Sequence, residues 1–372
     1  MRLTHLRLVQ FRNHRHSDVA PGPGVTLFVG GNAQGKSSLL EAVQVAATAR
    51  SPRARHDAEM IALGADWARV RAALLRGGRG EEIDVAYRRE DPATGGRVGR
   101  EIRVNGVPTR RGELFGHLHS VLASPNDTET VTGGPHLRRR VVDLLLAQVS
   151  PSYYYSSQRY ARAVLQRNRL LRTRSIQGLD AWDEQIASLG AVMTVRRKDM
   201  VARLAAFGAP IYGALSLGRE PLELEYLPSL QGEDEPALAT FAREALERRR
   251  PEEIARGITL VGPHRDDLHL GAGGRDLRMF GSRGQQLTAM LALRLAGRRV
   301  LWEETGEEPV MLFDDVLLTL DEERQAYLMD CVRGIQALMT VTTLALIGAR
   351  PPDAIVYRVQ DGIVEADRAH LP

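Results

Sequence analysis

Residues 30–37 of the chain read Gly-Gly-Asn-Ala-Gln-Gly-Lys-Ser, which fits the pattern G-x-x-x-x-G-K-[ST]. Residues 25–29, directly before it, are apolar and rich in β-branched and aromatic side chains, which predicts a buried strand. Residues 38–49, directly after it, are rich in helix formers. A strand, a glycine turn and a helix in this order present backbone N–H groups and a positive helix end to an anion. The stretch therefore predicts a phosphate-binding loop.

The residues of this loop have separate expected roles. Gly30 and Gly35 allow unusual backbone angles and a close approach of phosphate. Lys36 would reach the β- and γ-phosphates of a nucleotide, and the Ser37 hydroxyl would hold Mg²⁺. The predicted nucleotide contacts are Gly30, Gly31, Asn32, Ala33, Gln34, Gly35, Lys36, Ser37 and Ser38.

Arginine supplies almost all of the positive charge. Of the 50 Lys and Arg residues, only Lys36 and Lys198 are lysines. A compact ammonium group suits the last position of a phosphate loop better than the wide, planar guanidinium group does. One of the two lysines stands at that position, which argues against a chance match in a chain with 35 glycines.

The composition limits the possible classes of protein. A chain of 372 residues has room for about two domains, or one large domain with an insertion. A single cysteine, Cys331, excludes a disulfide framework. The sequence has no apolar run long enough for a transmembrane helix and no signal peptide, so we expect a cytoplasmic protein. The net charge of +4 does not by itself indicate a nucleic-acid partner, but the pI near 9.4 justifies a search for basic patches.

The pattern of residues changes twice along the chain. Before residue 124 we expect antiparallel strands around the phosphate loop, with Asn105-Gly106 as a strong hairpin signal. Residues 124–254 are mostly helix-prone, with breaks at 150–151 and 176–178 and one strand at 221–227. After residue 255 the α/β pattern returns, with strands predicted at 258–261, 268–270, 277–280, 309–313, 339–344 and 354–359 and a long helix at 284–304. The sequence thus predicts an α/β domain formed by 1–123 and 255–372, interrupted by a mostly helical domain at 124–254.

Two aspartates follow a strongly apolar predicted strand at 309–313. Asp314 stands at the end of that strand, where a phosphate-loop fold places a carboxylate near Mg²⁺. Asp315 could orient or deprotonate an attacking water molecule. Such an aspartate can also be a simple helix cap, but the phosphate loop upstream favours a catalytic pair. Lys36, Asp314 and Asp315 are the predicted catalytic residues.

Ser282, Gly284 and Gln285 lie at the start of the predicted helix 284–304. The Ser282 hydroxyl and the N-terminus of the helix can receive an anion, and the same serine can also be an ordinary helix cap. The order of motifs decides between these interpretations. A phosphate loop, a large insertion, S-x-G-Q before a helix and an Asp-ended strand follow one another as in ABC-type ATPases, where the signature serine contacts the nucleotide of a partner chain.

An arginine-rich segment lies in the predicted helical domain. Residues 138–174 contain nine arginines and one acidic residue, Asp143. Positions 159, 162 and 169 share one helical face, which suits the phosphates of a DNA backbone but does not read bases. A solvated arginine face is the alternative. The predicted DNA contacts are Arg138, Arg139, Arg140, Arg159, Arg162 and Arg169.

Together these motifs resemble the RecF family of bacterial recombination mediators, which are SMC/Rad50-like ABC ATPases. The resemblance covers nearly the whole chain, and its most specific parts are the strings G-G-P-x-x-R-R…D at 133–143 and G-P-H-R-D-D at 262–267. The other matching stretches are 11–14 (Phe-Arg-Asn-His), 31–37, 124–125, 282–285 and 314–315. The resemblance implies an ABC-type ATPase head, with a parallel phosphate-loop sheet and an antiparallel β lobe, and a compact helical arm.

The resemblance also implies an activity. ATP and Mg²⁺ would drive homodimerisation on double-stranded DNA or at single-/double-strand junctions, with slow, DNA-stimulated hydrolysis. With RecR and RecO, the protein would help load RecA at gaps coated by single-strand-binding protein. Arg12 and Asn13 would lie near the adenine and phosphates, Ser282 would act in trans, and Thr343 would take the switch position.

Three other classes of protein share some of these motifs. A coiled-coil SMC/Rad50 protein would need sustained heptads in the insertion, and residues 124–254 lack them. A transporter ATPase subunit would carry its switch His near Thr343. The third class is a nucleotide-gated scaffold that does not hydrolyse ATP, and only a hydrolysis assay separates it from the ATPase.

Overall fold

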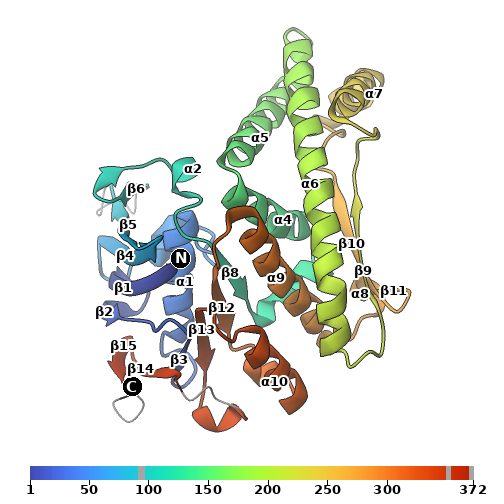
Figure 1. Cartoon of the computed structure of the whole chain (residues 1–372). Helices are drawn as coiled ribbons and strands as arrows, with labels where there is room; N and C mark the ends of the chain where they lie inside the picture. Colours follow the sequence, from blue (N-terminus) through green and yellow to red (C-terminus); the bar gives the residue numbers. More distant parts are fainter. Residues whose placement is uncertain (91–96, 349–352, 368–372) are drawn as a thin grey trace. The chain divides into compact units, whose positions relative to one another are not determined.

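The computed structural model describes residues 1–90, 97–348 and 353–367. The chain forms two compact units, Met1–Asp127 with Gly297–Pro372, and Thr128–Ala296 (Figure 1). The chain returns from the second unit to the first between Ala296 and Gly297, whereas the predicted boundary is at 254/255. Residues 255–296 group with the helical segment because β10 (Asp267–Ala272) pairs antiparallel with β9 (Leu222–Leu227) across that boundary.

The first unit contains a mostly parallel sheet. Its order in the described residues is β15-β14-β3-β13-β12-β8, and all neighbours pair in parallel except β14 and β15. The strands are β3 (Val25–Val29), β8 (Ser120–Ala123), β12 (Val310–Asp314), β13 (Ala337–Val341), β14 (Ile355–Gln360) and β15 (Ile363–Ala366). All five residues of β13 are buried. A continuous apolar run is expected for a parallel strand that is covered on both faces.

A second, antiparallel sheet in the same unit follows the order β2-β1-β4-β5-β6-β7 in the described residues. Its strands are β1 (Arg2–Phe11), β2 (His14–Val19), β4 (Trp67–Arg76), β5 (Arg79–Arg89), β6 (Val98–Val104) and β7 (Val107–Pro108). The predicted hairpin at Asn105-Gly106 is confirmed, with φ of 51° and 78° at the two turn residues. Helix α1 (Lys36–Thr48) contacts strands of both sheets and is buried along almost its whole length, so one apolar core joins the two sheets.

The second unit is mostly helical. Its main helices are α4 (Pro135–Val149), α5 (Pro151–Arg172), α6 (Leu179–Leu215) and α7 (Glu235–Arg256). The predicted breaks are confirmed: the Ser150 side chain accepts a hydrogen bond from Tyr153 N at the start of α5, and Gly178 has a φ of 86° before α6. A sheet of order β11-β10-β9 packs beside the helices, with β11 at Arg275–Asp276. Helix α9 (Arg283–Thr305) contains the crossing back to the first unit.

The remaining elements are short. They are α2 (Arg111–Leu114), α3 (Thr128–Thr132), α8 (Leu277–Phe280), α10 (Glu322–Cys331) and the 3₁₀ turns η1 (Asp57–Met60), η2 (Pro125–Asp127), η3 (Leu317–Thr319) and η4 (Leu344–Leu346). Over the ranges that the structure describes, every helix is too short or too polar to cross a membrane.

Two predicted strands are wrong, and a third ends earlier than predicted. Residues 277–280 form helix α8 because the Asp276 carboxylate accepts hydrogen bonds from Arg278 N and Met279 N at its start. Residues 258–261 form no strand because the Thr259 carbonyl is occupied by the side chains of His264 and Arg265. Strand β13 ends at Val341 rather than at residue 344, since Thr343 caps the turn η4.

Candidate nucleotide-binding site

The parallel sheet brings the phosphate loop and the two aspartates to one edge. The loop follows β3, Asp314 ends β12 with Asp315 directly after it, and β13 lies between these strands. Thr340 of β13 is level with Phe28 on one side and with Asp314 on the other. Loops at the carboxyl ends of parallel strands meet at one edge of a sheet, which is where α/β folds bind ligands.

The backbone of the loop explains its glycines. Gly35 has a φ of 111°, which is open to glycine but strained for other residues. Gly30 is needed for space, because a Cβ there would overlap the Val359 carbonyl oxygen on β14. Ala33 also has a positive φ, 62°, although it carries a side chain. Strain of this kind is characteristic of functional loops.

Lys36 is held inside the loop. Its side chain is 3% exposed, and its ammonium group donates hydrogen bonds of 2.8 Å to the carbonyl oxygens of Gly30 and Gly31. Asn32 and Ala33 are exposed at the tip of the loop, while Ser37 in the first turn of α1 is half-buried. The charged group that we expect to bind phosphates is therefore already at the site, where it is bound to backbone carbonyls.

Arg12 contacts a carboxylate. Its Nη2 and Nε atoms donate to the two carboxylate oxygens of Glu41 on α1, at 2.6 and 3.0 Å. Glu41 also accepts from Arg53 at 2.6 Å and from the Ser51 hydroxyl. Burial alone would raise the pKa of Glu41, but hydrogen bonds from Arg12, Ser51 and Arg53 and the charge of Arg53 lower it. Glu41 and Arg53 were not predicted to belong to the site, because Glu41 has the appearance of an ordinary helix residue in the sequence.

Asn13 supports the loop from the β1–β2 turn. Its Nδ2 atom donates to the carbonyl oxygen of Gln34 at 3.0 Å. His14, the next residue, lies fully buried with Nε2 3.0 Å from the carbonyl oxygen of Gly35. In the sequence, His14 stands out only as part of the motif at 11–14 and carries no predicted role. Asn13 therefore contacts the loop backbone, while Arg12 points to α1.

The two aspartates lie in a crowded, partly buried place. Burial and the neighbouring charge of Asp314 raise the pKa of Asp315, while the Lys36 charge and a hydrogen bond from Thr340 act in the opposite direction. Asp315 has a φ of 51°, a strained angle for a non-glycine residue, directly after β12. Lys36 follows β3 and Asp315 follows β12, on either side of β13, so both residues lie at the same edge of the sheet.

The oxygen donors at this edge suit Mg²⁺. The Ser37 hydroxyl and the Asp314 carboxylate are the hard oxygen ligands that Mg²⁺ uses together with nucleotide phosphates. Among the described residues no cluster of three or more His, Cys, Asp or Glu side chains could form an all-protein metal cage. A site of few protein ligands fits Mg²⁺, which normally keeps waters and substrate phosphates. Thr343 lies exposed in the loop that follows β13.

The signature residues Ser282, Gly284 and Gln285 lie in the second unit. Ser282 caps α9: its hydroxyl accepts from Gln285 N at 3.2 Å, and its own N–H donates to Gln285 Oε1 at 2.8 Å. Gln285 in turn donates from Nε2 to Glu220 at 2.8 Å. Ser282 and Gly284 are exposed. The serine therefore has helix-cap geometry, at an end of α9 that is open to solvent.

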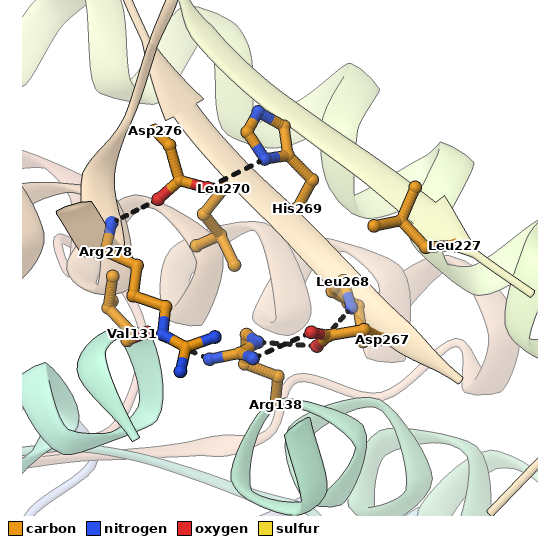
Figure 2. A pocket seen from close by; sticks show the side chains of 9 residues that line it. All are labelled: Val131, Arg138, Leu227, Asp267, Leu268, His269, Leu270, Asp276 and Arg278. Carbon is orange, nitrogen blue, oxygen red and sulfur yellow. Dashed lines mark hydrogen bonds and ion pairs between the residues drawn. The ribbon is translucent and has the colours of Figure 1, made fainter. Parts of the chain in front are cut away.

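The six predicted DNA-binding arginines divide into two groups. Arg138 does not fit the prediction, because it is 3% exposed and pairs with Asp267 at 2.7 Å and 2.9 Å (Figure 2). It also donates to the carbonyls of Val131 and Gly133 at 2.9 Å each. A cavity of about 70 Å³ beside this pair is far too small for a nucleotide, since ligand pockets measure roughly 300–1,000 Å³. Arg139 is half-buried and donates to the Asp266 carbonyl.

The other arginines lie at the surface. Arg140 is exposed on α4, and Arg159, Arg162 and Arg169 are exposed on α5. The guanidinium groups of the three on α5 have no hydrogen-bond or ion-pair partner anywhere in the described ranges of the chain. Free, exposed guanidinium groups on one helical face are available to a polyanion.

The string at 262–267 is contacted by several elements of the second unit. Asp266, fully buried, accepts hydrogen bonds from Arg197, Tyr226 and the N–H of Ser229. His264 lies 2.6 Å from the Tyr160 hydroxyl, and burial lowers the pKa of His264 to about 4. These contacts join α5, α6 and β9 to the segment that leads into β10. The arginines of the earlier string, Arg138 and Arg139, bind this segment, so the two strings specify one packing arrangement.

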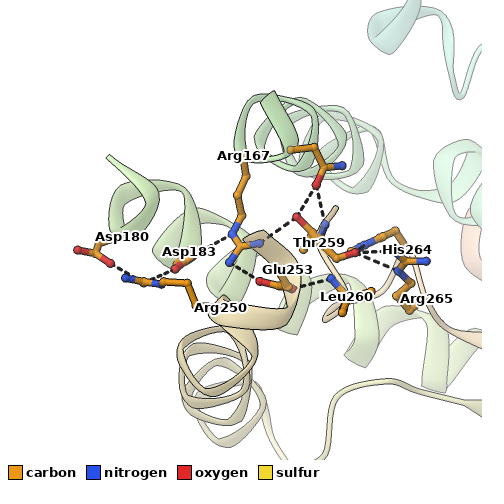
Figure 3. A network of polar contacts seen from close by, with 10 residues as sticks. Arg167, Asp180, Asp183, Arg250, Glu253, Thr259, Leu260, His264 and Arg265 are labelled. Carbon is orange, nitrogen blue, oxygen red and sulfur yellow. Dashed lines mark hydrogen bonds and ion pairs between the residues drawn. The ribbon is translucent and has the colours of Figure 1, made fainter. Parts of the chain in front are cut away.

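A neighbouring network has a completely buried ion pair at its core. Arg167 on α5 is 0% exposed and forms ion pairs with Asp183 on α6 and, at 2.6 Å, with Glu253 on α7 (Figure 3). It donates a further hydrogen bond of 3.1 Å to the Thr259 hydroxyl. Arg250 extends the network by pairing with Asp183 at 2.7 Å. Of the nine arginines in the basic segment, Arg138 and Arg167 therefore have structural roles.

Comparisons with known proteins agree with this architecture. A sequence family described as "AAA domain" matches residues 5–112. The chain is 40% identical to the "DNA replication and repair protein RecF" of Symbiobacterium thermophilum, over 99% of each chain. It is 37% identical to the protein of the same name from Heliobacterium modesticaldum, over 97% of this chain and 98% of the relative.

Solved structures are similar over the same length. One titled "Structure of the recombination mediator protein RecF-ATP in RecFOR pathway" superposes with a TM-score of 0.89 at 29% identity, covering 98% of this chain and 97% of that chain. An Smc head domain from Pyrococcus furiosus, with a TM-score of 0.56 at 16% identity over 98% and 95% of the two chains, shares the fold alone. The predicted α/β fold of the ABC-type ATPase head is therefore confirmed. The chain belongs to the RecF family of DNA replication and repair proteins.

Proposed function

We propose that this chain is an ATP-switched DNA-binding mediator of recombination and repair. ATP binding at the phosphate loop drives two copies together on double-stranded DNA or at a single-/double-strand junction, and slow, DNA-stimulated hydrolysis releases them. The observation that carries the proposal is the convergence of Lys36, Asp314 and Asp315 at the carboxyl-end edge of three neighbouring strands of the parallel sheet.

Lys36 and Asp315 have distinct roles in this proposal. The Lys36 ammonium group exchanges its two backbone carbonyl partners for the β- and γ-phosphates when ATP enters. Asp315 orients the attacking water and accepts its proton. Its raised pKa brings the carboxylate closer to the range in which a general base is effective. Bound Mg²⁺, held by Ser37 and Asp314, would neutralise phosphate charge.

The dimer completes the site. Ser282 caps an exposed helix end and sits where backbone N–H groups can receive a phosphate from a second copy of the chain. Gly284 and Gln285 form the rest of this contact, and Thr343 senses the nucleotide from the loop after β13. Each ATP is then covered by two chains, which makes dimerisation depend on ATP.

DNA binds through its backbone. The side chains of Arg159, Arg162 and Arg169 are exposed and without partners among the described residues, and Arg140 is exposed nearby in sequence. Such a surface neutralises phosphates and reads no bases. RecR and RecO would join the DNA complex and RecA would be loaded at gaps coated by single-strand-binding protein, in the cytoplasm. This assignment is supported by the family and by the related structure's title, which names the RecFOR pathway.

The test is sedimentation of the wild-type chain and two variants, Lys36→Ala and Ser282→Arg, with ATP, with ADP and without nucleotide, each with and without duplex DNA. We expect an ATP-dependent dimer for wild type and none for Lys36→Ala or Ser282→Arg. Ser188→Arg, at an exposed serine on α6, is the matched control and should dimerise like wild type. Dimerisation of Ser282→Arg with ATP would refute the role of Ser282 in trans.

Hydrolysis distinguishes the ATPase from a scaffold. We expect slow phosphate release by wild type that rises with duplex DNA and disappears in Lys36→Ala. ATP-dependent dimers without any hydrolysis, even with saturating duplex or gapped DNA, would instead establish a nucleotide-gated scaffold.

A further inference from the structure

Two turns hold the phosphate loop from behind. The Gln34 carbonyl oxygen accepts hydrogen bonds of 3.0 Å from Asn13 Nδ2 and from the N–H of Gly362. The Gly35 carbonyl oxygen lies 3.0 Å from His14 Nε2 and also accepts from Ser38 N in the first turn of α1, at 2.9 Å. The contacts come from the β1–β2 turn with the first residue of β2, and from the β14–β15 turn.

The side chain of Gln34 is held by the same turn of the C-terminal hairpin. Its Oε1 atom accepts a hydrogen bond of 2.6 Å from the N–H of Asp361. The two turns are also joined to each other, because the Ser17 hydroxyl lies 2.8 Å from His14 Nδ1 and 3.1 Å from the Gly362 carbonyl oxygen. Gln34 and Gly35 are thus held by a closed set of contacts within the chain.

These contacts determine where the loop's donors point. In a trans peptide the C=O and the following N–H point in opposite directions within one plane. Fixing the Gln34 carbonyl therefore fixes the Gly35 N–H, and fixing the Gly35 carbonyl fixes the Lys36 N–H. Carbonyl oxygens repel phosphate and N–H groups attract it, so this orientation is the one that an anion requires.

Gly362 and His14 are suited to this role. Gly362 has a φ of 75°, and a Cβ there would overlap the Asn13 carbonyl oxygen, so only glycine allows the two turns to touch. His14 is fully buried, and burial lowers its pKa, which favours the neutral ring. A neutral ring with its proton on Nε2 donates to the Gly35 carbonyl. The Ser17 hydroxyl, which donates to the Gly362 carbonyl oxygen, then lies beside the unprotonated Nδ1 atom.

We propose that the β1–β2 and β14–β15 turns preset the phosphate loop for nucleotide, with His14 and Gly362 as positioning residues for ATP. The inference rests on the proposed ATP site and adds to it a contribution from the last strands of the chain. A loop that is already ordered loses less conformational entropy on binding, so its affinity is higher.

The first test measures the dissociation constant for ATP of wild type, Gly362→Ala and Gly106→Ala by titration calorimetry. Gly106 is a matched control because it occupies the same position of a similar hairpin turn, with a φ of 78°, and a Cβ there meets nothing within 4 Å. Both alanines bear the same backbone strain, but only Gly362→Ala separates the turns. We expect Gly362→Ala to weaken ATP binding by roughly tenfold or more, and Gly106→Ala to leave it unchanged.

The second test uses His14. His14→Gln keeps an N–H donor near the position of Nε2, whereas His14→Leu fills the site without one. We expect KM for ATP to rise roughly tenfold in His14→Leu and to recover in His14→Gln, with kcat at saturating ATP within about threefold of wild type. A drop in kcat with unchanged KM, or equal losses in both variants, would overturn the positioning role.

The outcomes separate this inference from the proposed function. If Lys36→Ala binds ATP as well as wild type does, the ATP site itself is misassigned. If Lys36→Ala loses ATP but both Gly362→Ala and His14→Leu bind it normally, the site stands and the role of the two turns is refuted. Thermal unfolding of each variant without nucleotide identifies any variant that fails to fold. If Gly362→Ala fails to fold, the two His14 variants still decide the test.

Discussion

The hydroxyl of Thr340 donates a hydrogen bond of 2.9 Å to Oδ1 of Asp314. The Thr340 hydroxyl oxygen in turn accepts a hydrogen bond of 2.8 Å from the N–H of Asp315. One buried side chain on β13 therefore orients the carboxylate that we assign to Mg²⁺ and the backbone of the proposed general base. Thr340 does not stand out in the sequence, because a single threonine in an apolar strand carries no motif.

Replacement of this hydroxyl should affect hydrolysis more than binding. Thr340→Val keeps the shape but leaves the Asp315 N–H without its acceptor, so we expect roughly 1–3 kcal/mol less stability and a clear loss of kcat. ATP affinity should change much less, because Lys36 and the loop are untouched. Thr340→Ser retains the hydroxyl and should restore most of kcat in a phosphate-release assay. Equal activity of the Val and Ser variants would contradict this role.

The two glycines at the start of the loop should respond differently to a methyl group. A Cβ at Gly30 overlaps the Val359 carbonyl, whereas the nearest atom to a Cβ at Gly31 is Gln34 Cγ at 3.7 Å. We expect Gly30→Ala to lower the free energy of unfolding by about 1–3 kcal/mol, the usual cost of overpacking, and Gly31→Ala to change it little. Urea unfolding of the two variants without nucleotide measures the difference.

Removal of the Asp315 charge should stabilise the fold and stop hydrolysis. Its pKa is raised above the value in the unfolded chain, chiefly by burial, so the folded state binds the proton more tightly and loses stability as pH rises through these pKa values. At neutral pH the charged carboxylate therefore costs stability, and Asp315→Asn should melt at a higher temperature than wild type. The gap between the two proteins should close at acidic pH. Thermal scans from about pH 4 to 8 test this, and a lower Tm for the variant at neutral pH would contradict it.

The exposed arginines of α5 should contribute to DNA binding through charge alone. We expect the triple change of Arg159, Arg162 and Arg169 to Gln to weaken binding to duplexes of different sequence equally. The slope of log affinity against log salt should become shallower by about 0.9 for each phosphate that is no longer neutralised. A control that removes the same charge at Arg88, Arg333 and Arg358, all exposed in the first unit, should leave the slope nearly unchanged. An unaltered slope in the α5 variant would favour a merely solvated helix face.

Arg167 should instead be required for folding. Arg167→Met would leave Asp183 and Glu253 as buried carboxylates without their main partner, which costs about 3–5 kcal/mol. Arg162→Met, on the exposed face of the same helix, should cost under about 0.5 kcal/mol. Chemical denaturation followed by tryptophan fluorescence reports on the second unit when Trp67 and Trp302, both in the first unit, are replaced by Phe in all variants, because Trp182 then remains on α6. Similar unfolding midpoints for the two variants would contradict this assignment.

The elements that were predicted correctly have strong local signals. The strand, loop and helix around Lys36 and the hairpin at Asn105-Gly106 follow from short stretches whose glycines, caps and apolar residues agree with one another. The failures occurred where a side chain from elsewhere competes with the local preference. Asp276 turns 277–280 into a helix, and side chains bound to the Thr259 carbonyl prevent a strand at 258–261. The Asp361-Gly362 turn has a recognisable hairpin signal, but the strand β15 that follows it is too short to show a clear alternating pattern.

The sequence by itself determined the chemistry of this protein: a phosphate loop with one of only two lysines, an Asp-ended strand and an arginine-rich helical segment. Those features depend on residue types at short spacings, so they can be recognised along the chain. Only the tertiary structure decided which residues hold the phosphate loop, the two aspartates and the helices of the second unit in place. It buried Arg138 and Arg167 in ion pairs, tied Arg12 to Glu41, and brought His14, Thr340 and Gly362 against the loop and the aspartates. The physical reason is that burial and pairing join segments from tens to more than three hundred residues apart, and no local pattern records such contacts.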